Sequence, residues 1–263
     1  KLVLLEGLRN ALECRQFSLL YQPKVDLRTG RIFGVEALIR WQHPEHGMVS
    51  PARFIALAEE SGLIIPIGDW VLQTACRQAR AWCDAGLPRM TMSVNVSPRQ
   101  FEEKRLVERV AHALHDSGLP AGALEIEVTE GLIMRDLAQS VGKMGELKAM
   151  GVALSIDDFG TGYSSLSALK SFPISTLKID KSFVSDLADN AGDQAIALAV
   201  ISLGHRLNLR VLAEGVETEQ QRRFLLDNDC DEMQGYLFSR PLPPAGVEEL
   251  LRRQAREALA GAH

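Results

Sequence analysis

The chain has 263 residues, of which 46% are hydrophobic, and its formal net charge is −5 at pH 7. This composition can fill a large core, and it excludes the basic surface that duplex nucleic acid binding requires. We find no signal peptide and no apolar run long enough to cross a bilayer, so we expect no membrane contact from this segment.

The four cysteines lack the spacing of a zinc site. This use of cysteine is typical of proteins in a reducing compartment, so we expect a cytoplasmic location. The chain begins at Lys1 without an initiator methionine, inside a helical pattern. We therefore interpret it as part of a longer protein, whose missing region could hold a sensor or a membrane anchor.

The first third of the chain predicts a helix, a β-hairpin and two further helices. Leucines at helical spacing indicate the first helix, and two apolar stretches flanking an Arg-Thr-Gly turn indicate the hairpin. The expected ranges are 2–14 for the first helix, 18–25 and 32–39 for the strands, and 53–61 and 67–85 for the later helices.

From residue 90 onward, short apolar strands alternate with amphipathic helices. Strands are expected over 90–94, 124–128, 152–156, 175–179 and 210–213, with a last short one before Gln234. Helices are expected over 101–117, 136–150, 193–207, 217–227 and 245–259, with another beginning near Ser164. This alternation indicates parallel βαβ units. The strand count and chain length favour a (β/α) barrel, in one domain over 1–263, rather than an open doubly wound sheet.

The strand over 152–156 ends in two adjacent acids, Asp157 and Asp158, and a glycine-rich loop follows. Burying two carboxylates is costly unless a cation meets them. The pair could cap the next helix, because Asp is a good N-cap, or it could bind a divalent metal.

Other predicted strands also carry a polar side chain at or near their carboxyl end. These residues are Glu36, Asn95, Glu127, Asp157, Asp158, Lys178, Glu214 and Gln234. In a barrel, these ends open on one face, where sites are built. Structural alternatives exist: Glu36 could pair with Arg40, Asn95 could cap a helix, and Lys178 could sit in a buried ion pair. If these residues formed no common site, a separate explanation of this kind would have to hold on every strand, which is improbable.

The converging groups are carboxylates, amides and one lysine, without histidine or cysteine. Oxygen ligands of this kind suit Mg²⁺ or Mn²⁺ rather than zinc, and the number of carboxylates makes two ions plausible. Two-metal sites catalyse in-line phosphoryl displacement. Lys178 could hold a water or a phosphate oxygen, and Arg40 could hold a phosphate. The pattern predicts a metal-dependent phosphate-ester hydrolase. A metal-dependent barrel enzyme acting on carbon acids would use a similar residue set.

Several motifs also follow one another in a familiar order. They are Glu36-Ala37-Leu38, Asn95-Val96-Ser97, residues 127–130, residues 157–165, residues 177–180, residues 213–217 and Gln234-Gly235-Tyr236. In these motifs the chain resembles the EAL domains, the bacterial cyclic di-GMP phosphodiesterases, over about residues 8–251. Gly131 is a departure, at a position where a serine is expected. The resemblance implies a modified (β/α)8 barrel whose first strand runs antiparallel to the others.

The resemblance also implies residue roles. Two Mg²⁺ or Mn²⁺ ions would be held by Glu36, Asn95, Glu127, Asp157, Asp158 and Glu214, with Asp158 as the bridge. Catalysis would involve Lys178, which positions the attacking water, with Glu36 and Glu214, the latter as ligand or general base. Substrate-binding residues would be Gln22, Leu38, Arg40, Asp180, Gln234 and Tyr236. For Tyr236, a role as a core aromatic is the alternative. A regulatory group would comprise Glu130, Phe159, Gly160, Thr161, Gly162, Tyr163 and Glu217, linking metal occupancy to a dimer contact.

The implied reaction is hydrolysis of cyclic di-GMP to linear pGpG. The implied partners are cyclic di-GMP, a second copy of the chain, and an upstream sensor or GGDEF-type domain. A catalytically silent cyclic di-GMP receptor or interaction module is the alternative.

Overall fold

A nine-stranded sheet forms the centre of the molecule, and its strand order is β1-β9-β8-β7-β6-β5-β4-β2-β3. The computed structural model describes residues 2–133, 136–161 and 166–260. An additional pairing of β1 with β2 closes the sheet, so eight of the described strands form a barrel and β3 extends β2 outside it. The strands are β1 (Phe17–Asp26), β2 (Ile32–His43), β3 (Gly47–Val49), β4 (Thr91–Asn95), β5 (Leu124–Thr129), β6 (Ala153–Phe159), β7 (Thr176–Ile179), β8 (Arg210–Ala213) and β9 (Glu232–Met233).

Strand β1 runs opposite to its neighbours in the barrel. It pairs antiparallel with β2 and with β9, whereas the pairs from β2–β4 through β8–β9 are all parallel. The predicted barrel with a reversed first strand is therefore confirmed, and the open doubly wound sheet is excluded. The hairpin register places Gln22 opposite Glu36, so a residue in the middle of β1 reaches the carboxyl-end face of the barrel.

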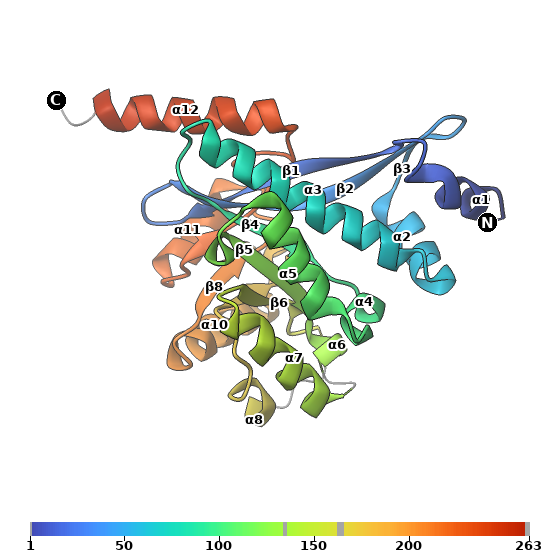
Figure 1. The fold of residues 1–263 in the computed structure, drawn as a ribbon. Helices are drawn as coiled ribbons and strands as arrows, with labels where there is room; N and C mark the ends of the chain where they lie inside the picture. The colour runs from blue at the N-terminus through green and yellow to red at the C-terminus, as the bar shows by residue number, and fades with distance from the viewer. Residues whose placement is uncertain (1, 134–135, 162–165, 261–263) are drawn as a thin grey trace.

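Helices surround the barrel, and α12 runs along the top of the view beside β1, which it contacts (Figure 1). The helices are α1 (Leu2–Ala11), α2 (Pro51–Ser61), α3 (Ile64–Asp84), α4 (Pro98–Glu102), α5 (Leu106–Ser117), α6 (Glu130–Ile133), α7 (Leu137–Ala149), α8 (Leu166–Leu169), α9 (Lys181–Ser185), α10 (Ala191–Arg206), α11 (Glu219–Asp227) and α12 (Pro244–Ala260). In the described part of the chain, none of these is long and apolar enough to span a membrane.

Most predicted elements are present with shifts of a few residues, and the differences have local causes. The helix expected over 101–117 is two helices, because the non-helical backbone of Glu103, with ψ of 131°, ends α4, and a capping box of Ser97 and Gln100 starts α4 before residue 101. The strand expected to end at Ile156 continues to Phe159. The start of the helix expected near Ser164 lies outside the described residues. Sequence analysis missed β3, α6 and α9, all of five residues or fewer.

Alternation along the strands separates an apolar exterior from a polar interior. In β5, the side chains of Leu124, Ile126 and Val128 are fully buried within the hydrophobic core. Glu125 and Glu127 lie between them and point the other way, because successive side chains of a strand alternate between its faces. The barrel therefore holds buried charges that need partners inside it.

Candidate active site

A local irregularity in β6 turns the two adjacent aspartates toward the same site. The pairing of β6 with β7 shifts register between Ile156 and Phe159, and Asp158 adopts a left-handed backbone with φ of 54°. In a regular strand, neighbouring side chains would point to opposite faces. Here, both Asp157 and Asp158 line one pocket, and a ligand oxygen from each lies within 4.8 Å of one from Glu214.

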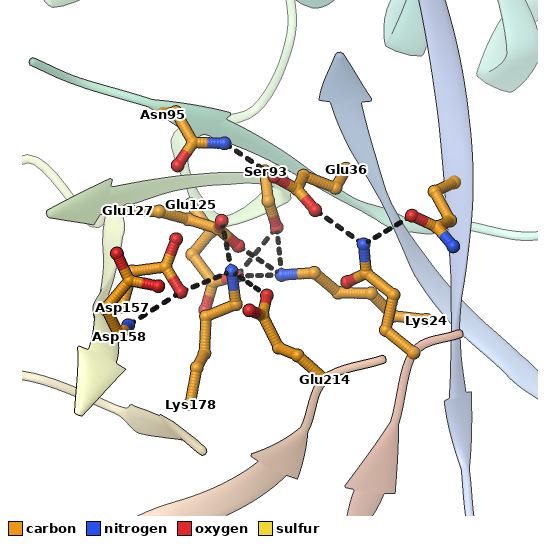
Figure 2. A network of polar contacts seen from close by, with 12 residues as sticks. Lys24, Glu36, Ser93, Asn95, Glu125, Glu127, Asp157, Asp158, Lys178 and Glu214 are labelled. Atoms are coloured by element: carbon orange, nitrogen blue, oxygen red, sulfur yellow. Dashed lines mark hydrogen bonds and ion pairs between the residues drawn. The ribbon is translucent and has the colours of Figure 1, made fainter. Parts of the chain in front are cut away.

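The ammonium group of Lys178 lies in the middle of these acids. It is fully buried, and it contacts Glu127 at 2.6 Å, Asp157 at 3.0 Å and Glu214 at 2.6 Å (Figure 2). Its three N–H donors thus meet carboxylates from three different strands or strand ends. The buried ion-pair alternative for Lys178 is therefore present in the structure, within the predicted group of site residues.

A second group of side chains surrounds Glu36 beside this cluster. The amide of Asn95 donates to Glu36 Oε1 at 2.5 Å, and the amide of Gln234 donates to Glu36 Oε2 and to Gln22. Glu36 does not pair with Arg40, whose guanidinium donates to the Ile39 carbonyl at 2.9 Å. The two structural alternatives for Glu36 and Asn95 are thus wrong, since Ser97 rather than Asn95 caps the next helix.

Crowding of these carboxylates in a buried place changes their proton affinity. Burial raises the pKa of Glu214 to about 8. The positive charge of Lys178 lowers this pKa, whereas the negative charges of Asp157 and Glu36 raise it. Burial likewise raises the pKa of Glu36. Burial and the charge of Asp157 raise the pKa of Asp158 to about 6. The acids are therefore short of positive charge, and a cation would allow them to ionise together.

The charge balance and the ligand types fit divalent cations. The residues labelled in Figure 2 include six carboxylates (Glu36, Glu125, Glu127, Asp157, Asp158 and Glu214) and two lysines (Lys24 and Lys178). If all ionise, four negative charges are left over, which is the charge that two divalent ions would neutralise. The oxygen donors, with no histidine or cysteine among these labelled residues, suit Mg²⁺ or Mn²⁺.

Two pockets adjoin the cluster and share Asn95 and Asp157. One, of about 350 Å³, is also lined by Gln22, Glu36 and Gln234. The other, of about 460 Å³, is lined by Leu38, Arg40, both aspartates and apolar side chains of α2 and α3. Five of the six predicted substrate-binding residues therefore divide between two neighbouring pockets on the carboxyl-end face, and Asp180 lines neither.

Tyr236 lies at the mouth of the smaller pocket and is not a core aromatic. It is 47% exposed, with the Arg240 guanidinium 4.4 Å and the Lys181 ammonium 5.7 Å from its ring centre. Lys181 also pairs at 2.6 Å with Glu217, which lines the same pocket, although the resemblance assigns Glu217 to the regulatory group with the loop after β6. Asp180 caps α9, and it accepts a hydrogen bond from the carboxyl group of Asp158 when Asp158 is protonated.

The loop after β6 is tied to the end of β5. Buried Glu130 accepts a hydrogen bond at 3.1 Å from the backbone N–H of Gly160, whose φ of 97° favours glycine. Thr161 is exposed and its hydroxyl donates to the Asp158 carbonyl, while Phe159 is buried. Gly162 and Tyr163 lie outside the described residues.

Sequence analysis missed a buried layer beneath the site, formed by Lys24, Ser93 and Glu125. Lys24 donates to both of the others and to Glu127. The available signal was a spacing of two: Lys24 follows Gln22, Ser93 precedes Asn95, and Glu125 precedes Glu127. Residues two apart on a strand share a face, so each predicted site residue indicates an inward neighbour.

Comparison with known proteins agrees with the fold and the site. The family model "EAL domain" matches residues 5–241, so the chain belongs to the EAL domain family. Among curated proteins, the bifunctional diguanylate cyclase/cyclic di-GMP phosphodiesterase MucR of Pseudomonas aeruginosa is 50% identical over 251 residues, which cover 95% of this chain and 36% of MucR. Cyclic di-GMP phosphodiesterase NbdA of the same species is 48% identical, over 94% of this chain and 32% of NbdA.

A solved structure described as "PaMucR Phosphodiesterase, c-di-GMP complex" superimposes with a TM-score of 0.91 at 50% identity. The match covers 93% of this chain and 99% of that one. The resemblance to EAL domains is thereby confirmed. This chain spans about a third of the length of the two curated relatives named above.

Proposed function

We propose that this chain hydrolyses cyclic di-GMP to linear pGpG, with two Mg²⁺ or Mn²⁺ ions at the carboxyl-end face of the barrel. The observation that carries the proposal is the surplus of buried carboxylates around Lys178, next to two open pockets, in a member of the EAL domain family. Relatives named as cyclic di-GMP phosphodiesterases support the choice of substrate.

The residues that would hold the ions are Glu36, Asn95, Glu127, Asp157, Asp158 and Glu214. When bound, the ions would supply positive charge to the attacking and leaving oxygens of the phosphodiester. Asp158 is the candidate bridge, because its left-handed backbone places it beside Asp157 and within reach of Glu214. The same cations would release Lys178 from part of its carboxylate contacts.

In the reaction, a water oxygen forms a bond to phosphorus, and the bond from phosphorus to the 3′ oxygen breaks. The ammonium of Lys178 holds the water through an N–H donor, and Glu214 or Glu36 takes its proton. The leaving 3′ oxygen acquires a proton and becomes a hydroxyl. One phosphodiester is opened, and the second remains in the linear product.

Ligand contacts would come from both pockets. Arg40 is positioned to hold a phosphate through its guanidinium, with Leu38 beside it in the larger pocket. Gln22 and Gln234 present amides in the smaller pocket, and exposed Tyr236 offers a ring for base stacking at its mouth. Asp180 would contribute from beside Asp158, whose pKa its negative charge raises.

The loop contact offers a route for regulation. The hydrogen bond from Gly160 to Glu130 joins the segment after Asp158 to the start of α6. We propose that this segment, which spans Phe159 to Tyr163, acts with Glu217 to couple metal occupancy to association of two copies of the chain. A GGDEF-type or sensor domain upstream and a cytoplasmic location belong to the same proposal.

The test is incubation of the purified chain with cyclic di-GMP and Mg²⁺ or Mn²⁺, with products separated by chromatography. We expect pGpG from the parent and from Glu108→Ala, which alters an exposed acid on α5. Glu36→Ala and the parent in a chelator should give none. Tight binding of intact cyclic di-GMP without product would favour the receptor alternative, and neither binding nor product would overturn the choice of ligand.

A further inference from the structure

A second lysine, Lys24 of β1, is buried one layer below the candidate metal ligands. It is 1% exposed, and its ammonium contacts Ser93 Oγ at 2.6 Å, Glu125 Oε2 at 2.8 Å and Glu127 Oε1 at 2.5 Å (Figure 2). These three contacts use all of its N–H donors. Ser93 in turn donates to Glu125 at 2.7 Å, so the layer is a closed hydrogen-bonded group.

The two lysines hold Glu127 from two sides. Lys24 contacts Oε1, and Lys178 contacts Oε2 at 2.6 Å, so each carboxylate oxygen has its own cation. These two contacts fix the orientation of the Glu127 carboxylate, whereas Glu214 has only Lys178 as its ion-pair partner among the contacts of the described residues.

Neutralising Glu125 does not explain the contact with Glu127. Lys24 and Glu125 are a neutral pair, and such a buried pair can usually be replaced by apolar side chains without loss of stability. The additional contact reaches a residue at the edge of the site, and partners of this kind orient metal ligands in proteins. The contact with Glu127 thus links the Lys24–Glu125 pair, which lies outside both pockets, to the candidate metal site.

We propose that Lys24 is a positioning residue, which holds Glu127 Oε1 with the support of Ser93 and Glu125 so that Glu127 is correctly oriented for a divalent cation. The inference rests on the proposed function, because it takes Glu127 as a metal ligand. Lys24 itself would touch neither substrate nor metal.

The informative variant replaces the neutral pair as a unit, Lys24→Met with Glu125→Met. Lys24→Met alone would leave Glu125 buried without its cation and could fail to fold. The double variant keeps the formal charge of the site unchanged, so an altered metal affinity would report orientation rather than charge. The matched control is Arg210→Met with Glu232→Met, another ion pair of the barrel strands, which contacts none of the candidate ligands.

The measurement is Mn²⁺ binding without substrate, followed by the paramagnetic resonance signal of free Mn²⁺, with circular dichroism to confirm folding. Turnover of cyclic di-GMP at saturating Mn²⁺ is measured beside it. We expect about tenfold or greater loss of Mn²⁺ affinity in the double variant and less than a twofold change in the control pair.

A folded double variant that binds Mn²⁺ within twofold of the parent would overturn the positioning role, whether or not the parent is active. A parent that binds no Mn²⁺ would overturn it as well. A parent that binds Mn²⁺ without hydrolysing cyclic di-GMP would refute the proposed function instead, and the affinities would still decide the role of Lys24.

Discussion

At the scale of single residues, Asp158 combines a backbone requirement with a charge requirement. Its φ of 54° is a left-handed conformation that Asp and Asn tolerate better than most other non-glycine residues. Its backbone N–H donates to Asp157 Oδ1 at 3.0 Å, and its carboxyl group, when protonated, donates to Asp180. The two requirements can be separated by substitution, because Asn satisfies the first and removes the second.

We expect Asp158→Asn to keep the fold and to lower metal-dependent turnover by about a hundredfold or more, since it removes a candidate bridging charge. Asp158→Ala should lose turnover similarly and, in addition, be roughly 1–2 kcal/mol less stable than the Asn variant, because alanine is strained at this φ. Denaturant unfolding in a chelator and assays with Mn²⁺ check both. Equal stability of the two variants, or an active Asn variant, would contradict this account.

At the scale of elements, the loops after β8 and β9 support each other at a close backbone approach. The Val216 N–H donates to the Gln234 carbonyl at 3.1 Å, and the Leu237 N–H donates to the Val216 carbonyl at 3.0 Å. Gly235 lies within this exchange, and a Cβ there would overlap the Val216 backbone. Glu214 and Gln234 belong to these two loops, so their placement depends on the contact.

Gly235→Ala should therefore cost about 1–3 kcal/mol of stability and lower kcat as Glu214 and Gln234 shift. The matched control is Gly142→Ala in α7, where a Cβ has open space and helix propensity favours alanine. Thermal unfolding and turnover of both variants are the measurements. If the two substitutions had the same effect on unfolding temperature, the close approach would not be what constrains this loop pair.

The helices and strands also show how much of the fold and of the site can be predicted from the sequence. Period-two alternation and helical spacing are local patterns, and they predicted most of the strands and helices. The polar residues at the strand ends are local features as well, so they predicted the face of the barrel where Glu36, Glu127 and Glu214 meet. The bulge at Asp158 depends on pairing with β7, which no local pattern reveals. Lys24 was missed because a lysine in a hairpin strand looks solvent-exposed until the barrel closes around it.

At the scale of the whole molecule, the barrel is an apolar shell around an acidic interior. Hydrophobic contacts between strands and helices stabilise the shell, while the carboxylate surplus inside it opposes folding as the acids ionise. Glu214 determines whether stability rises or falls with pH, because its pKa in the folded chain is raised to about 8. The contribution of Glu214 to the free energy of unfolding is therefore fully present below the ordinary pKa of a glutamate, and it is lost as the pH rises through about 8.

The metal-free chain should therefore lose stability between about pH 5 and pH 8, and a divalent cation should restore it most at the upper end. At a concentration of 100 times its dissociation constant, a ligand specific for the folded state adds about 2.7 kcal/mol. Thermal unfolding in chelator and in Mn²⁺, at pH 5.5 and pH 8, measures both effects. Glu214→Gln should flatten the pH dependence in chelator, because it carries no titratable group there. A Mn²⁺ effect of equal size at both pH values would show that proton release from these carboxylates is not linked to ion binding, and that the surplus charge is balanced by other means.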